Sequence, residues 1–163
     1  MNEMRIVRTM LLFGLMALTA CVSAESVWDK ETEALSEPLE ITVYRSPTCN
    51  CCGKWIKHMK KHQFKVTDIL SNDMNAVKAK LGVPPRLASC HTAVINGYVI
   101  EGHVPAADVK TLIKNKPDVV GLSVPGMPGG TPGMEMGGRK DPFDMVSFDK
   151  DGKQRKFNEY SFY

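Results

Sequence analysis

The hexapeptide TCNCCG, from Thr48 to Gly53, places three cysteines within four residues. Just before it, Ile41 to Tyr44 (ITVY) is β-branched and aromatic, which predicts a strand, and Pro47 then fixes a turn. Just after it, apolar residues recur near helical spacing, opposite a face of lysines. The cysteines are therefore expected at a helix N-terminus, where unpaired backbone N–H groups and the helix dipole favour the thiolate form.

Two further elements follow the cysteine-bearing helix, which is expected to run to about Gln63. Residues 65–70 (KVTDIL) predict a second strand. Ser71 or Asn72 suits the cap of a second helix, and Gly82 marks the C-terminal end of that helix. The domain thus begins with a β-α-β-α unit.

The dipeptide Asn96-Gly97 is the strongest short hairpin signal in the chain, because a type I′ turn needs positive φ at both central residues. It joins two predicted strands, residues 92–95 and 98–101. Pro105 suits the first turn of a helix that ends before Pro117. The order β-α-β-α-β-β-α, with a C-x-x-C after the first strand, resembles the thioredoxin fold, so we predict an α/β, thioredoxin-like domain.

Residues 125–138 are rich in glycine and proline, a composition that neither helix nor strand tolerates. We therefore predict a long loop, and such loops are usually functional or disordered. The loop carries three methionines, Met127, Met134 and Met136. After it, residues 143–148 and 157–160 flank Asp151-Gly152 and predict a C-terminal β-hairpin.

The N-terminus is typical of a secretory signal, with two arginines before an apolar run too short to span a bilayer. Two ends fit the sequence: residues 1–24 for ordinary cleavage, or residues 1–20 if Cys21 is the lipidated cysteine of a lipobox. Residues 25–40 are polar and acidic and are expected to form a linker, which leaves residues 41–163 as the domain. We therefore predict a periplasmic protein, either soluble or anchored as a lipoprotein.

The composition limits the classes of partner. A chain of 163 residues, 43% of them hydrophobic, suffices for one domain with its own core, so disulfides are not needed to stabilise the fold. The formal net charge is only +3, and no run of lysine and arginine is interleaved with aromatic residues. Nucleic acid is therefore excluded as a partner.

Four cysteines remain once Cys21 is set aside: Cys49, Cys51, Cys52 and Cys90. In a thioredoxin-like fold the position of Cys90, just before the third strand, lies against the C-x-x-C loop. The four sulfurs are then close enough for two interpretations without a metal: two disulfides, or one disulfide and two thiols. An inert, disulfide-stabilised domain is therefore one alternative.

Metal binding accounts for more of the sequence. Thiolate and thioether ligands select Cu(I), whereas a structural zinc site would leave the loop methionines without a role. Cys51 and Cys52 are adjacent in the chain, so their side chains diverge and would strain a single tetrahedral metal centre. Sulfurs that bridge several metal ions fit this spacing better. We predict a polynuclear Cu(I) site with these ligands: Cys49, Cys51, Cys52, Cys90, Met127 and Met134.

Other side chains have a weaker case as ligands. His91 and His103 could ligate as neutral imidazoles, but each lies beside the end of a predicted element, where a hydrogen bond to the backbone is the commoner role. Met136 is less favoured than the other two loop methionines. His58 and His62 belong to the lysine-rich helix face and are expected to be solvated.

Four separated motifs resemble those of the periplasmic copper-resistance proteins of CopG type: Cys49 to Cys52, Ser89 to Ala93, Gly102 to Pro105 and Gly126 to Glu135. The resemblance covers about residues 41–160. It implies a thioredoxin-like domain with a cysteine-bridged cluster of several copper ions, thiolates from the four cysteines, and thioethers from Met127 and Met134. The family more often has glycine where this chain has Asn50.

Two functions from different classes therefore compete. The first is an extracytoplasmic copper-binding protein for copper resistance, redox-active or purely sequestering, with a periplasmic copper chaperone or exporter as its partner. The second is a thiol-disulfide oxidoreductase, which the C-x-x-C at a helix N-terminus favours. Against the second function, the chain lacks the proline that thioredoxin-like proteins usually have before the third strand. An oxidoreductase also leaves the methionine loop unexplained.

Overall fold

The computed structural model describes residues 26–30 and 32–163. The expected signal segment, in its 1–20 and its 1–24 version, lies outside the described residues, as does Cys21. Both interpretations of the signal therefore stay predictions. None of the helices in the described ranges is long and apolar enough to cross a membrane.

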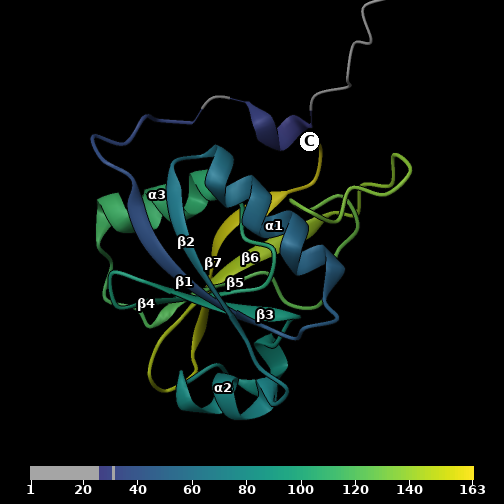
Figure 1. The fold of residues 1–163 in the computed structure, drawn as a ribbon. Helices are drawn as coiled ribbons and strands as arrows, with labels where there is room; N and C mark the ends of the chain where they lie inside the picture. Colours follow the sequence, from purple (N-terminus) through teal and green to yellow (C-terminus); the bar gives the residue numbers. More distant parts are fainter. Residues whose placement is uncertain (1–25, 31) are drawn as a thin grey trace, which may run out of the picture.

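The described chain forms one mixed sheet in the order β2-β1-β3-β4-β5-β6-β7 (Figure 1). β1 is parallel to β2, and β4 is parallel to β5, whereas the other neighbours are antiparallel. The strands are β1 (Leu39–Arg45), β2 (Phe64–Leu70), β3 (His91–Ile95), β4 (Tyr98–Glu101), β5 (Gly121–Ser123), β6 (Phe143–Phe148) and β7 (Gln154–Tyr160).

Helices cover both faces of this sheet. α1 and α3 lie on one side of the sheet, and α2 lies on the other (Figure 1). Their bounds are α1 (Asn50–Lys61), α2 (Met74–Lys80) and α3 (Ala106–Asn115), with short 3-10 turns at Val27–Asp29 and Pro85–Leu87. The cysteine-bearing helix α1 therefore packs on one face, next to β2, while α2 packs on the opposite face, next to β1 and β3.

Each face has its own apolar cluster. Trp55 of α1 and Leu112 of α3 belong to the larger cluster, which includes Ile100 of β4. Leu87 belongs to the smaller cluster, together with Val99 of the same strand. Successive side chains of a strand point to opposite faces, so β4 contributes to both clusters and fixes the positions of both layers.

The predicted class and the order of the first seven elements agree with the structure. Asn96 and Gly97 have φ values of 48° and 84°, as a type I′ turn requires. The expected C-terminal hairpin corresponds to β6 and β7, which are antiparallel. The assignment to the thioredoxin-like fold in particular stays a prediction.

One local prediction was wrong, and one strand was missed. The cap of α2 is Asp73, whose carboxylate accepts a hydrogen bond from the Ala76 amide, rather than Ser71 or Asn72. β5 was not predicted at all; it inserts between β4 and β6 and joins the C-terminal hairpin to the rest of the sheet.

The segment expected to be a linker contributes to the core. Trp28 is buried, and its indole N–H donates to the Gly130 carbonyl at 2.6 Å. Its ring packs on Tyr160 and Tyr163 near the C-terminus, and β1 begins at Leu39 rather than at Ile41. This segment therefore ties the methionine-bearing loop to the end of the chain.

Candidate metal centre

Three of the predicted ligands lie in the first turn of α1. Cys49 is the N-cap residue, and its sulfur accepts a hydrogen bond from the Cys52 amide at 3.4 Å. Cys49 and Cys52 form a disulfide, with their Cα atoms 5.4 Å apart. Of the arrangements that the sequence left open, the structure thus has one disulfide and two thiols.

The two thiols belong to Cys51 and Cys90, which are half-buried. The Cys51 sulfur lies 3.5 Å from the Cys49 sulfur and 4.0 Å from the Cys90 sulfur. All four sulfurs lie within 4.8 Å of one another. The predicted convergence of Cys90 on the C-x-x-C loop is therefore observed, while the ligand role of each cysteine stays a prediction.

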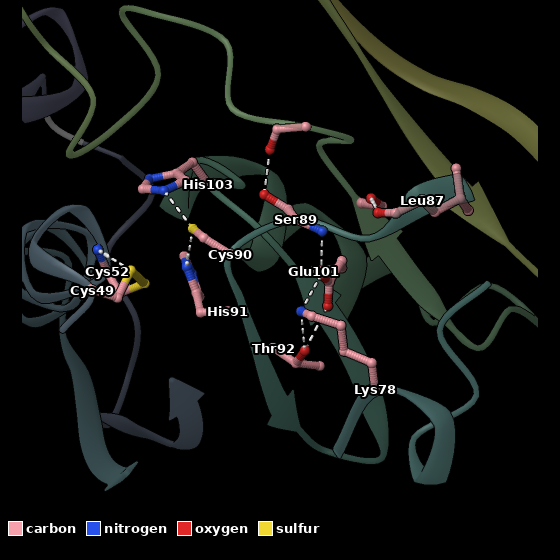
Figure 2. Close-up of polar contacts among 12 residues, drawn as sticks. Cys49, Cys52, Lys78, Leu87, Ser89, Cys90, His91, Thr92, Glu101 and His103 are labelled. Carbon is pink, nitrogen blue, oxygen red and sulfur yellow. Dashed lines mark hydrogen bonds and ion pairs between the residues drawn. A yellow bond between two sulfur atoms is a disulfide. The ribbon is translucent and has the colours of Figure 1, made fainter. Parts of the chain in front are cut away.

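A buried imidazole faces the Cys90 sulfur (Figure 2). His103 Nε2 lies 3.0 Å from this sulfur, and His103 Nδ1 lies 2.8 Å from the Pro132 carbonyl oxygen. A carbonyl can only accept a hydrogen bond, so Nδ1 carries the proton. Burial lowers the pKa of His103 and keeps the ring neutral, so Nε2 presents its lone pair to the sulfur. Such a backbone contact is typical of a metal-binding histidine.

His91 approaches the same sulfur from its other side. Its Nδ1 lies 3.3 Å from the Cys90 sulfur, and its ring centroid is 4.4 Å from that of Trp55. Complete burial holds the pKa of His91 well below its usual range, and the positive charge of a protonated His103 would lower it further. Its Nε2 is buried without a hydrogen-bond partner among the described residues. His91 thus places a second buried imidazole, also held neutral, against this sulfur.

Cys90 is protonated at neutral pH when no metal is bound. Burial, followed by the negative charge of a Cys51 thiolate, raises the pKa of the Cys90 thiol to about 12. The easier ionisation expected at a helix N-terminus does not extend to this residue, which precedes a strand. A metal ion bound by the Cys90 sulfur would therefore have to displace a proton.

The glycine- and proline-rich loop packs against the cysteine helix. Gly133 has a φ of +86°, and a Cβ on it would lie 2.7 Å from the Trp55 amide and 3.0 Å from the Cys51 carbonyl. The carbonyl of Pro132 holds His103, as described above. The absence of a side chain at Gly133 thus lets the loop approach the first turn of α1 directly.

The loop methionines differ in exposure. Met134, next to Gly133, is half-buried, whereas the side chains of Met127 and Met136 are more than half exposed. Met127 follows Gly126, whose carbonyl accepts a hydrogen bond from the Ser89 hydroxyl. The residue before each predicted thioether residue therefore lies against a cysteine-bearing segment, and the ligand roles of Met127 and Met134 stay predictions.

The prediction that His58 and His62 are solvated was wrong, because the N-terminal segment covers them and both are buried. With Asp29 they form a second group whose ligand atoms lie within 4.8 Å. These groups are already used: His58 Nε2 accepts from the Ala106 amide, His62 Nε2 donates to the Trp28 carbonyl, and Asp29 pairs with Lys61. This group therefore supports packing rather than a metal.

For His103 the sequence favoured a backbone hydrogen bond over ligation. In the structure one ring nitrogen makes the backbone contact and the other faces the Cys90 sulfur, so the two roles are compatible and the ligand role stays a prediction. The signal was available in the sequence, because His103 stands between Gly102 and Pro105 in a tight connection after a strand. It could be interpreted only once that connection was known to return to Cys90.

The chain is similar to proteins of known structure. Two solved structures, named copper resistance protein CopG form 1 and form 2, are 52% and 51% identical to the chain. Each match covers 76% of this chain and 98% or 99% of the other, with TM-scores of 0.72 and 0.73. No curated protein matches the chain.

A family model described as a protein of unknown function, DUF411, matches residues 87–134. That range runs from the turn before Cys90 to Met134 and includes His103. The identity and coverage of the two solved structures establish the relationship along most of the domain. The chain therefore belongs to the family of copper resistance protein CopG.

Proposed function

We propose that this protein confers copper resistance outside the cytoplasm by binding several Cu(I) ions at one sulfur-rich site. The observation that carries the proposal is the convergence of four cysteine sulfurs within 4.8 Å, in a chain related to copper resistance proteins. The proposed thiolate ligands are Cys49, Cys51, Cys52 and Cys90, and the proposed thioether ligands are Met127 and Met134. His103 Nε2, whose lone pair faces the Cys90 sulfur, is a further proposed ligand atom.

The disulfide makes copper capacity depend on the redox state. While Cys49 and Cys52 are joined, Cys51 and Cys90 are the cysteines of the described residues that can supply thiolates. Reduction of the disulfide by two electrons and two protons, for example from a dithiol, yields two more thiols. All four then bind copper as thiolates and release their protons. The reduced protein should thus bind more copper than the oxidised protein.

The test is copper analysis of the purified protein, prepared with and without a dithiol reductant, after removal of weakly bound metal. We expect more than one copper ion per reduced chain and fewer in the oxidised chain. A Cys90→Ser variant should bind less than the reduced wild type. A stoichiometry of one or less in the reduced protein, or a preference for zinc over Cu(I), would overturn the proposal.

A second function has one specific observation in its favour. The Cys49–Cys52 disulfide lies at a helix N-terminus, and the Cys51 thiol is 3.5 Å from Cys49. A Cys51 thiolate could attack the Cys49 sulfur, form a new disulfide and release Cys52 as a thiolate, as in thiol-disulfide exchange. The alternative is therefore a thiol-disulfide oxidoreductase.

The two functions predict opposite effects from two variants. Changing Met127 and Met134 together to leucine removes both thioethers but keeps apolar bulk, and thioethers take no part in disulfide exchange. If the protein is a copper site, copper-sensitive cells that express this methionine variant should grow less well in copper than cells with the wild type, while insulin reduction is unchanged. For an oxidoreductase, Cys49→Ser should abolish insulin reduction, and the methionine pair should be neutral in both assays.

We further propose that the protein acts in the periplasm, soluble or held by a lipid on Cys21, and exchanges copper with a chaperone or exporter. The support is the signal-like N-terminal sequence. The mass of the mature chain tests this, since a lipid-modified N-terminal Cys21 and an unmodified Glu25 N-terminus give different masses. A chain that retains Met1 and stays in the cytoplasm would contradict the location.

A further inference from the structure

A buried carboxylate lies on the face of the sheet opposite α1 (Figure 2). The Glu101 side chain at the end of β4 has no exposed surface, and it accepts three hydrogen bonds. Lys78 Nζ of α2 donates to it at 2.5 Å, the Thr92 hydroxyl at 2.6 Å and the Ser89 amide at 2.6 Å. Every oxygen of this carboxylate is thus used.

The stability of the fold does not by itself explain this arrangement. Replacing a buried ion pair by apolar residues of similar size is often neutral or stabilising, because the charges lose their hydration. What distinguishes this pair is the third hydrogen bond, which links it to the residue directly before Cys90. Lys78 neutralises the carboxylate, and Glu101 in turn holds the Ser89 amide.

The position of Ser89 affects both parts of the metal centre. Its hydroxyl donates to the Gly126 carbonyl, next to Met127 in the loop. The backbone of Gly102 is packed against it: a Cβ on Gly102 would lie 2.6 Å from the Ser89 Cβ and 2.7 Å from the Val124 carbonyl. A shift of Ser89 would therefore move the Cys90 sulfur and the start of the methionine loop together.

We propose that Glu101, neutralised by Lys78, is a positioning residue that holds Ser89 and thereby keeps the Cys90 sulfur between Cys51 and His103. Glu101 touches neither sulfur nor metal, and it acts through the Ser89 amide. The consequence for copper affinity rests on the proposed function. The geometry of the two thiols does not, because it can be measured without copper.

Two double variants separate the hydrogen bond from the ion pair. Lys78→Met with Glu101→Gln removes both charges but keeps an amide oxygen that can accept from the Ser89 amide. Lys78→Met with Glu101→Leu also removes both charges, and it leaves the Ser89 amide without its acceptor. Neither variant buries an unpaired charge. Lys65→Met with Glu40→Leu is the matched control, since it removes an exposed ion pair between β1 and β2.

The first measurement is the rate at which a diazene oxidant joins Cys51 to Cys90 in the copper-free protein, scored by peptide mapping. Each thiol loses one hydrogen, and the diazene is reduced to a hydrazine. We expect the glutamine variant and the control to stay within about twofold of wild type, and the leucine variant to be slowed about tenfold. Cu(I) affinity should follow the same ranking.

Two results would overturn the proposal: a folded leucine variant that couples the two thiols at the wild-type rate, or equal slowing of the glutamine and leucine variants. If the leucine variant does not fold, Gly102→Ala provides the test, because it displaces Ser89 while both charges remain paired. A folded Gly102→Ala protein with wild-type coupling would overturn the proposal. Normal coupling rates without copper binding by the wild type would instead contradict the proposed function.

Discussion

The molecule contains two buried histidine pairs that have similar ring separations but differ in chemistry. His91 and His103 have ring centroids 5.0 Å apart, and those of His58 and His62 are 4.6 Å apart. Both pairs belong to groups with the spacing of a metal site. In the first pair, His103 Nε2 faces the Cys90 sulfur at 3.0 Å. In the second, His58 Nε2 accepts from the Ala106 amide, also at 3.0 Å.

The difference shows that the partners of the ring nitrogens identify a candidate metal site better than the closeness of the side chains does. The backbone holds one nitrogen of His103 and leaves the other directed at sulfur. For His58, the backbone occupies the nitrogen that a metal would need, because a neutral ring with Nε2 as acceptor carries its proton on Nδ1. The Pro105 N-cap of α3 has no side-chain hydrogen bond, so His58 satisfies one of the free amides of that helix.

The largest effect we expect is on acid stability through His58. Burial, followed by the charge of His62, lowers the pKa of His58 from 6.5 to about 3. Between these two pH values, His58 is thus protonated in the unfolded chain but not in the folded chain. Stability should be unaffected by this group above pH 6.5 and should fall as the pH drops toward 3, by up to roughly 5 kcal/mol in total.

Urea unfolding as a function of pH checks this expectation. His58→Gln is the informative variant, because its amide oxygen can still accept from Ala106 but does not titrate. Its free energy of unfolding should fall less steeply than that of the wild type over this pH range. Parallel pH profiles for the two proteins would show that His58 is not the group responsible.

The second effect concerns the other histidine pair. His103→Leu removes the nitrogen that faces Cys90 and the hydrogen bond to Pro132, so we expect Cu(I) affinity to fall about 10- to 100-fold. A competition titration with a Cu(I) chelator measures this change. His58→Gln is the control and should keep wild-type affinity. Equal affinities for His103→Leu and wild type would place the copper site away from this ring.

The third effect, the change of Cu(I) affinity with pH, is smaller for each pH unit than the two effects above. Because the pKa of the Cys90 thiol is raised to about 12, copper must displace its proton throughout the neutral range. Affinity should therefore rise with pH, by about tenfold per unit for each proton displaced. Cys90→Ser should reduce this slope by the contribution of one proton. An unchanged slope would argue against ligation by Cys90.

Local patterns predicted much of the fold because the relevant interactions are local. The hairpin at Asn96-Gly97 and the helix after Pro105 depend on backbone geometry that these residues fix themselves. β5 was missed for a non-local reason. A Cβ on Gly121 would lie 1.8 Å from the Val99 carbonyl, so the close approach of β4 requires glycine, which on its own argues against a strand.

The candidate site was predictable in part for the same reason. The spacing of the cysteines in the first turn and the position of Cys90 before a strand indicated that the sulfurs would meet. The burial of His58 could not be inferred, because the lysines on its helix indicated a solvated face. A segment about 30 residues earlier, anchored by Trp28, covers that face instead. Only tertiary contacts reveal that cover.

The smallest effect we expect tests this cover directly. His62 donates from Nε2 to the Trp28 carbonyl at 2.7 Å, and its Nδ1 lies 3.2 Å from the Thr32 hydroxyl. His62→Leu keeps a side chain of similar volume but removes both contacts. The free energy of unfolding should therefore fall by about 1 kcal/mol. Urea unfolding at pH 7 measures this loss, and Cu(I) affinity should be unchanged because His62 does not face Cys90. A loss of copper affinity in this variant would mean that the second histidine pair does bind metal, and the distinction drawn from the ring nitrogens would be wrong.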